Sequence, residues 1–257
     1  MRFIVLGSGT AVPDAHRGPA GFAVQSPEGM WLVDGGSGTV QRCAQSGVDI
    51  LELQGGFYSH LHPDHCADLI SLCFAMRVNR PRRRMDYRVW GPQGTQSHVD
   101  KLTSVWGHHM KPGAGKLLVH EACETEATRF QHLDLTIDAR PANHTPGALH
   151  LSFAVGQHRV VYSGDTGPSQ HLVELAEASD LLVCECAGSD DKPIPGHMTP
   201  SDVAELVDAA RPKQVWLTHL YPQVDPMVAL ARVQRTGIQV RHAKDGDVWD
   251  DSTPTRL

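Results

Sequence analysis

The apolar residues of this chain fall into two patterns. Short apolar runs bounded by glycine, proline and polar clusters indicate β-strands, whereas apolar positions three and four apart indicate helices. We expect strands at Arg2–Leu6, Phe22–Gln25, Trp31–Asp34, Gly55–Tyr58, Tyr87–Trp90, Leu117–Glu121, Leu133–Arg140, Leu149–Val155, Val160–Ser163, Asp180–Cys186, Gln214–Thr218 and Ile238–His242. We expect helices at Thr39–Ser46, Ala67–Val78, Gln93–Trp106, His171–Ala176, Ser201–Ala210 and Pro226–Arg235, and a loop at Gly107–Gly115.

The order of these elements indicates the fold class. Strands crowd together in the middle of the chain, and helices alternate with strands toward both ends. A sheet must bury its apolar face against another layer. We therefore expect an α/β fold, a four-layer αββα sandwich of two mixed β-sheets flanked by helices. No repeat, linker or low-complexity tract interrupts the sequence, so we expect a single domain over residues 1–257.

Composition limits the partners and the cellular compartment that we expect for the protein. The 257 residues are 40% hydrophobic and 20% charged, with a net charge of −6, so a general affinity for nucleic acid is not expected and any polyanion site must be local. Six cysteines without a CxxC pair indicate reduced thiols and a cytoplasmic protein. The apolar run at Phe3–Leu6 is too short for a signal-peptide core or a membrane span, so no membrane contact is expected.

Side chains that can bind a metal ion are most closely spaced between Ser59 and Asp68, where the sequence reads SHLHPDHCAD. Imidazole nitrogens and carboxylate oxygens are the ligands that zinc and similar ions prefer. His60 and His62 occupy alternate positions and so point to the same side of an extended chain. A turn at Pro63 then allows Asp64 and His65 to return beside them and serve a second ion.

Three further candidates follow apolar strands, where a polar side chain can project into a cleft from a rigid backbone. These are His144 in PANHTPG, Asp165 in YSGDTGP and His219 in VWLTHLYP. Each alone is also explained as a loop residue that caps a turn, and Asp165 before Thr166 and Gly167 suits that explanation. The cluster at residues 60–65 requires partners, which favours ligation.

These motifs resemble the metallo-β-lactamase fold superfamily of hydrolases. They are His60-Leu61-His62-Pro63-Asp64-His65, His144, Ser163-Gly164-Asp165-Thr166 and Thr218-His219, in the order that the family shows. The resemblance implies two divalent metal ions, zinc as the first expectation and manganese or iron as alternatives. By the family pattern, His60, His62 and His144 hold one ion, Asp64, His65 and His219 hold the other, and Asp165 bridges them.

Within that superfamily the chain looks most like the ribonuclease Z branch of phosphodiesterases. The resemblance rests on Leu6–Pro13, on Trp90-Gly91-Pro92 and on Gly196-His197-Met198-Thr199. It implies that His197 contacts the scissile phosphate with support from Glu185, so the expected catalytic residues are Asp64, His197 and Glu185. The alternative for His197 is a loop residue before a helix that Thr199 or Ser201 caps.

Two departures from that branch concern the substrate. The tRNA-processing enzymes carry a long arm between the third metal histidine and the bridging aspartate, whereas here residues 145–164 form the whole connection between His144 and Asp165. Ala15 stands where their loop carries a lysine, which argues against pre-tRNA. The related phosphodiesterases of phosphonate breakdown have an N-terminal cysteine cluster, but no cysteine precedes Cys43 here.

We therefore expect a binuclear hydrolase, a phosphodiesterase that attacks a small or cyclic phosphodiester through a metal-bound hydroxide. Hydrolysis of a carboxylic ester, thioester or lactone at the same site is the alternative, and an iron-dependent oxidoreductase is a third, disfavoured by Asp64 and Asp165. The expected partner is a small anionic substrate. The sequence is also compatible with short nucleic acid as a partner and with a homodimer. The basic stretch Arg77–Arg84 is either a solvated surface loop or part of the path by which an anionic substrate reaches the metals. His108 and His109 either border the substrate pocket or lie outside it.

Overall fold

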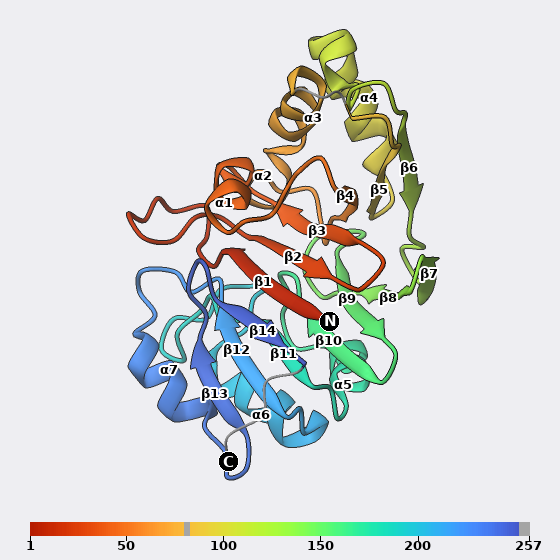
Figure 1. Cartoon of the computed structure of the whole chain (residues 1–257). Coiled ribbons are helices and arrows are strands. Elements are labelled where there is room, and N and C mark those ends of the chain that lie inside the picture. Colours follow the sequence, from red (N-terminus) through yellow and green to blue (C-terminus); the bar gives the residue numbers. More distant parts are fainter. Residues whose placement is uncertain (80–82, 252–257) are drawn as a thin grey trace.

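Two seven-stranded sheets pack face to face in the computed structural model, which describes residues 1–79 and 83–251. The first sheet has the order β14 (Val248–Asp250), β1 (Arg2–Gly7), β2 (Gly21–Gln25), β3 (Met30–Gly35), β4 (Leu53–Phe57), β5 (Tyr87–Gly91), β6 (Leu117–Glu121). The second has the order β13 (Gln239–His242), β12 (Gln214–Thr218), β11 (Leu181–Glu185), β10 (His158–Tyr162), β9 (Leu149–Val155), β8 (Leu135–Pro141), β7 (Thr128–His132). Figure 1 shows the two sheets one above the other.

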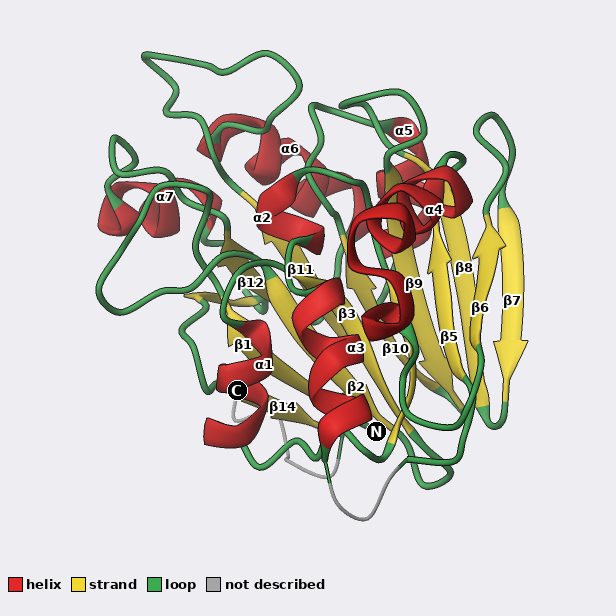
Figure 2. Cartoon of the chain, turned by 90° about the horizontal axis from the view of Figure 1, so that it is seen from above, coloured by secondary structure: helices red, strands yellow, loops and turns green. Residues whose placement is uncertain are grey.

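Helices cover the outer face of each sheet. On the first sheet lie α1 (Thr39–Gln45), α2 (Pro63–Cys66), α3 (Leu69–Val78), α4 (Thr95–Trp106) and the 3₁₀ helix η1 (Gly107–Met110). On the second lie α5 (Gln170–Ala176), α6 (Pro200–Ala210) and α7 (Pro226–Val233). The view from above shows α1 and α3 lying across the strands of the first sheet (Figure 2). The predicted αββα sandwich is confirmed.

Both sheets are mixed, and their parallel halves matter for the site. Strands β3 to β6 are parallel in the first sheet, and β10 to β13 are parallel in the second. Parallel neighbours end at the same edge of a sheet. The carboxyl ends of β10, β11 and β12 therefore meet along one rim.

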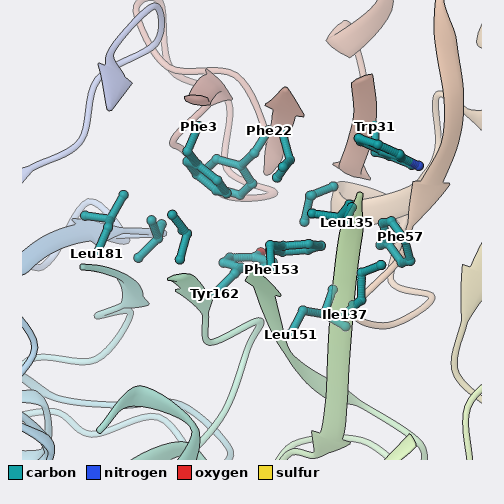
Figure 3. Close-up of a cluster of buried hydrophobic side chains, with 14 of the residues drawn as sticks. Phe3, Phe22, Trp31, Phe57, Leu135, Ile137, Leu151, Phe153, Tyr162 and Leu181 are labelled. Atoms are coloured by element: carbon teal, nitrogen blue, oxygen red, sulfur yellow. The ribbon is translucent and has the colours of Figure 1, made fainter. Parts of the chain in front are cut away.

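The core between the sheets follows from the alternation of side chains along each strand. In β1, Phe3 and Val5 face the second sheet, whereas Ile4 and Leu6 face the helices, and all four are buried. Strands covered on both faces read as continuous apolar runs, which is why the sequence pattern located most of them. Figure 3 shows Phe22 and Trp31 of the first sheet opposite Phe153 and Tyr162 of the second.

The structure corrects several predicted elements. The strand expected at Leu133–Arg140 is wrong at its start, because Leu133 takes a left-handed turn with φ of 56° between β7 and β8. Strand β7 was missed since its side chains alternate between exposed and half-buried at the sheet edge, and β14 was missed because it is so short. The loop expected at Gly107–Gly115 begins with η1, and the helix expected at Pro226–Arg235 ends at Val233.

Among the described residues, none of the helices has the length and apolar character needed to cross a bilayer.

Substitution of Phe153 tests how much the core between the sheets contributes to stability. Its side chain is fully buried, and its ring lies 5.6 Å from that of Phe57 in an edge-on contact. We expect Phe153→Ala to lower the free energy of unfolding by about 3–5 kcal/mol, because it leaves a cavity. Phe74→Ala, at a position 43% exposed, should cost about 1 kcal/mol or less. Urea denaturation measures both, and equal losses would contradict this description of the core.

Candidate metal centre

The candidate ligands lie where strands of both sheets end. His60 and His62 follow β4, and the proline after His62 is the first residue of the short helix α2. Proline suits that position because its missing N–H has no partner in a first turn. Asp64 and His65 lie within α2, directly behind that proline. The turn predicted at Pro63 is thus a single turn of helix.

The remaining candidate ligands come from the second sheet. His144 lies in the loop between β8 and β9, Asp165 follows β10, and His219 follows β12. The backbone of His219 is left-handed, with φ of 55°. The structure brings together all seven side chains that the sequence predicted as ligands.

The side chains form three sets of potential ligand atoms, and the atoms of each set lie within 4.8 Å of one another. The first set consists of His60, His62, His144 and Asp165, and the second of Asp64, His65 and His219. The third joins His197 to Asp165 and His219. Asp165 lies between the first two sets, because its oxygens are 3.8 Å from His60 Nε2, 3.4 Å from His65 Nε2 and 3.4 Å from His219 Nε2. Asp64 Oδ2 lies 3.9 Å from His65 Nε2 and 4.0 Å from His219 Nε2.

Several of these atoms are buried without a hydrogen-bond partner in the described part of the chain. They are Nε2 of His60, His65 and His219, and Oδ1 of Asp165. A buried polar atom that lacks a partner costs free energy, and most such atoms in proteins are paired. Nitrogen and oxygen atoms that converge without partners fit divalent cations, which accept both donor types.

The protonation of the imidazoles is consistent with ligation. Burial lowers the pKa of His219 to about 4, and burial also lowers the pKa of His60 and His144, so these rings are neutral near pH 7. A neutral imidazole is the form that binds metals. Burial opposes protonation of His65 too, but the carboxylates of Asp165 and Asp34 raise its pKa. A cation beside those carboxylates would take the place of that proton.

Hydrogen bonds orient three of the rings so that Nε2 faces the centre. His60 Nδ1 pairs with Ser59 Oγ at 3.1 Å, His144 Nδ1 with the Gly196 carbonyl at 2.9 Å, and His65 Nδ1 with Asp34 Oδ2 at 2.7 Å. Such partners fix the tautomer of a metal-binding histidine and strengthen the ligand.

Asp34 was expected only as the end of a strand, and its role in the site was missed. It is fully buried, and it accepts hydrogen bonds from the Ser59 backbone, the Ser59 hydroxyl and the Tyr162 hydroxyl at 2.7 to 2.8 Å. Its signal in the sequence is a carboxylate that ends the apolar run Trp31–Val33. Carboxylates rarely enter a core without such partners.

Glu185 and His197 form a pair beside the ligands. His197 Nδ1 lies 2.8 Å from Glu185 Oε1, and the His197 ring lies 4.8 Å from that of His144. Glu185 is buried and also accepts the backbone N–H groups of Thr166 and Ala187. Burial raises the pKa of Glu185 to about 7; burial opposes protonation of His197, but Glu185 raises its pKa. The pair thus retains a proton near neutral pH.

Two neighbours of His197 bear on the sequence predictions. Thr199 caps α6 in a capping box with Asp202, so the predicted helix cap is present, yet His197 also faces the ligands. The Tyr221 ring, which the sequence did not single out, lies 6.3 Å from the His197 ring and 5.7 Å from the His219 ring.

Other candidates lie elsewhere. Arg83 is buried, and its guanidinium donates to the carbonyls of Leu51 and Asp86, so it is neither a solvated residue nor a substrate contact. Arg80 and Arg82 lie outside the described residues. The His109 ring packs edge-on against Phe74, and His108 lines a cavity under α4 that none of the candidate ligands lines.

Comparisons with known proteins agree with this geometry. The model of the beta-lactamase superfamily domain matches residues 31–220. Ribonuclease Z from Mycobacterium marinum is 32% identical over 195 residues, which cover 71% of this chain and 69% of that protein.

Solved structures share the fold over nearly the whole chain. The metallo-β-lactamase fold protein YhfI from Bacillus subtilis matches with a TM-score of 0.83 at 24% identity, covering 96% of this chain and 98% of that chain. The short form of human tRNase Z matches with a TM-score of 0.78 at 20% identity, covering 97% and 99%. The chain therefore belongs to the β-lactamase superfamily, in its ribonuclease Z-like branch, and is a metal-dependent hydrolase.

Proposed function

We propose that this protein, as a single domain, hydrolyses a small anionic phosphodiester at a centre of two divalent ions, with zinc as the preferred metal. The observation that carries the proposal is the convergence of buried, unpartnered nitrogen atoms on the Asp165 carboxylate. His60, His62 and His144 would hold one ion, and Asp64, His65 and His219 the other, with Asp165 between them. When bound, two such ions lower the pKa of a water toward about 7 and stabilise charge on phosphoryl oxygens.

His197, supported by Glu185, would donate the proton that the leaving oxygen needs. Glu185 holds Nδ1 of His197, so the remaining ring nitrogen, Nε2, is free to donate a proton to the leaving oxygen. Glu185 is itself fixed by backbone N–H groups from Thr166 and Ala187. This support keeps the His197 ring in one orientation, as acid catalysis requires.

A cavity beside the centre supports a small anionic substrate. It has a volume of about 480 Å³, and its charged lining residues are the two arginines Arg17 and Arg42 and the two carboxylates Asp14 and Asp64. Guanidinium groups bind phosphate oxygens well. Arg17 is held in place by Asp14 and by the carbonyl of Leu220.

The connection between His144 and Asp165 also favours a small substrate. It contains the β9–β10 hairpin and no additional helix or strand among residues 145–164. The similarity to ribonuclease Z makes a short RNA the second candidate.

Substrate choice is tested first. We expect the zinc-loaded protein to hydrolyse bis-p-nitrophenyl phosphate with higher kcat/KM than p-nitrophenyl acetate, since the cavity provides guanidinium groups for an anion. Removal of metal by a chelator should abolish turnover, and zinc should restore it. Faster hydrolysis of the acetate would favour the carboxylic ester alternative, and chelator-resistant activity would contradict the proposal.

Metal content tests the ligand assignment. Asp64→Ala or His65→Ala should reduce the content from about two ions per chain to about one, because each removes a ligand of one set only. His171→Ala replaces an exposed histidine of α5 and should leave the content unchanged. Elemental analysis of the purified proteins measures the outcome. Two ions and full turnover in either ligand variant would refute the assignment.

His197 is expected to act in catalysis rather than in ligation. His197→Ala should lower kcat by about 10²- to 10⁴-fold, the usual contribution of a proton donor, while both ions remain bound. Because His197 lies close to Asp165 and His219, a loss of one ion would instead identify it as a ligand. Kinetics and elemental analysis on the same samples separate the two outcomes.

A further inference from the structure

His219 differs from the rings of His60, His65 and His144 in how it is held. The Nδ1 atoms of His60, His65 and His144 each have a partner, whereas both ring nitrogens of His219 are buried without one in the described part of the chain. A metal-binding histidine is usually oriented through its second nitrogen. The ring of His219 is therefore oriented by its backbone and by packing against the rings of His65, His197 and Tyr221.

That backbone is in an unfavourable conformation. The φ of 55° at His219 is left-handed, a region that non-glycine residues seldom occupy because the β-carbon crowds the following carbonyl, although histidine enters it more often than most. Such a conformation persists only where the surrounding structure fixes it. Contacts that fix it are thus part of what places the imidazole.

Three consecutive residues here are tied to the N-terminal segment. The His219 N–H donates to the Ser8 carbonyl at 3.0 Å, and the Thr218 hydroxyl donates to the same carbonyl at 3.2 Å. The Leu220 carbonyl accepts a hydrogen bond from Arg17 at 3.3 Å. The N-terminal segment thus determines the direction in which the chain leaves β12.

The N-terminal segment is in turn held by Asp245, in the turn between β13 and β14. Asp245 Oδ1 accepts the backbone N–H and the hydroxyl of Ser8, both at 2.8 Å. Its Oδ2 accepts the Gly18 N–H at 2.8 Å, next to Arg17. One carboxylate therefore holds Ser8 directly and also the backbone next to Arg17, whose guanidinium is held by Asp14 as well. Figure 1 shows β14, which follows this turn, beside β1.

Asp245 is not needed to close its own turn. Asp247 does that, since its carboxylate accepts the Lys244 N–H at 2.8 Å and pairs with Arg241. The Asp245 carboxylate instead accepts hydrogen bonds from residues more than two hundred positions away in sequence, with separations of 237 from Ser8 and 227 from Gly18. Asp247 therefore stabilises the turn itself, whereas Asp245 holds the N-terminal segment.

We infer that Asp245 is a positioning residue that holds His219, through Ser8, in place to bind one of the two ions. This inference rests on the proposed role of His219 as a metal ligand. It predicts a selective defect, because His60, His62 and His144 have no bond to this network among the described residues. The ion that Asp64, His65 and His219 would hold should weaken, and the other ion should not.

The test is a zinc titration of the metal-free protein in competition with a chromophoric chelator. The wild type should bind two ions. Asp245→Ala should bind one of them about 10- to 100-fold more weakly, the usual effect of losing a group that orients a ligand. Asp247→Ala is the matched control, since it alters the same turn without touching Ser8, and it should bind both ions as the wild type does.

Folding is monitored by circular dichroism. If Asp245→Ala does not fold, Asp245→Asn decides, because its amide leaves one of the Ser8 and Gly18 backbone N–H groups without an acceptor and should weaken the same ion. Unchanged affinities in a folded variant, or equal weakening of both ions, would overturn the inference. A wild type that binds fewer than two ions would instead refute the proposed function.

Discussion

The buried carboxylate of Asp165 is the group around which the site is built. It lies among Nε2 atoms of His60, His65 and His219, all buried, and the nitrogens have no other partner in the described chain. Burying a carboxylate is costly unless cations or donors compensate for lost water. Positive charge at this point is thus a requirement of the fold as well as of the chemistry. The parallel strands β10 and β12 deliver Asp165 and His219 to the same rim because both end there.

Asp34 joins this centre to the core between the sheets. It lies in β3 of the first sheet, and it accepts a hydrogen bond from the hydroxyl of Tyr162 in β10 of the second. The Tyr162 ring packs 4.9 Å from Phe22, within the apolar cluster. The position of the His65 ring therefore depends on the packing of the two sheets. A rigid core is one way in which a fold holds ligands to the narrow tolerance that metal binding requires.

Sequence alone indicated the sandwich and the seven predicted ligand residues that the structure brings together. The cluster at residues 60–65 is local, so its spacing is visible in the sequence, and the ligands after β10 and β12 follow apolar runs. Residues whose role depends on distant contacts were missed. Asp34 meets His65 across 31 positions and Asp245 meets Ser8 across 237, and no local pattern records either contact. Arg83 was misjudged for the same reason, because its partner Leu51 lies 32 positions earlier.

Electrostatics connects the size of the substrate with the charge of the chain. The net charge of −6 opposes a long polyanion spread over the surface, since like charges repel along its whole length. Two ions at the centre, with Arg17 and Arg42 in the adjoining cavity, would reverse the sign only locally. Screening limits such a field to roughly 8–10 Å at physiological ionic strength. An anion that fits within that range gains the attraction without the repulsion, and this supports the small anionic substrate proposed above.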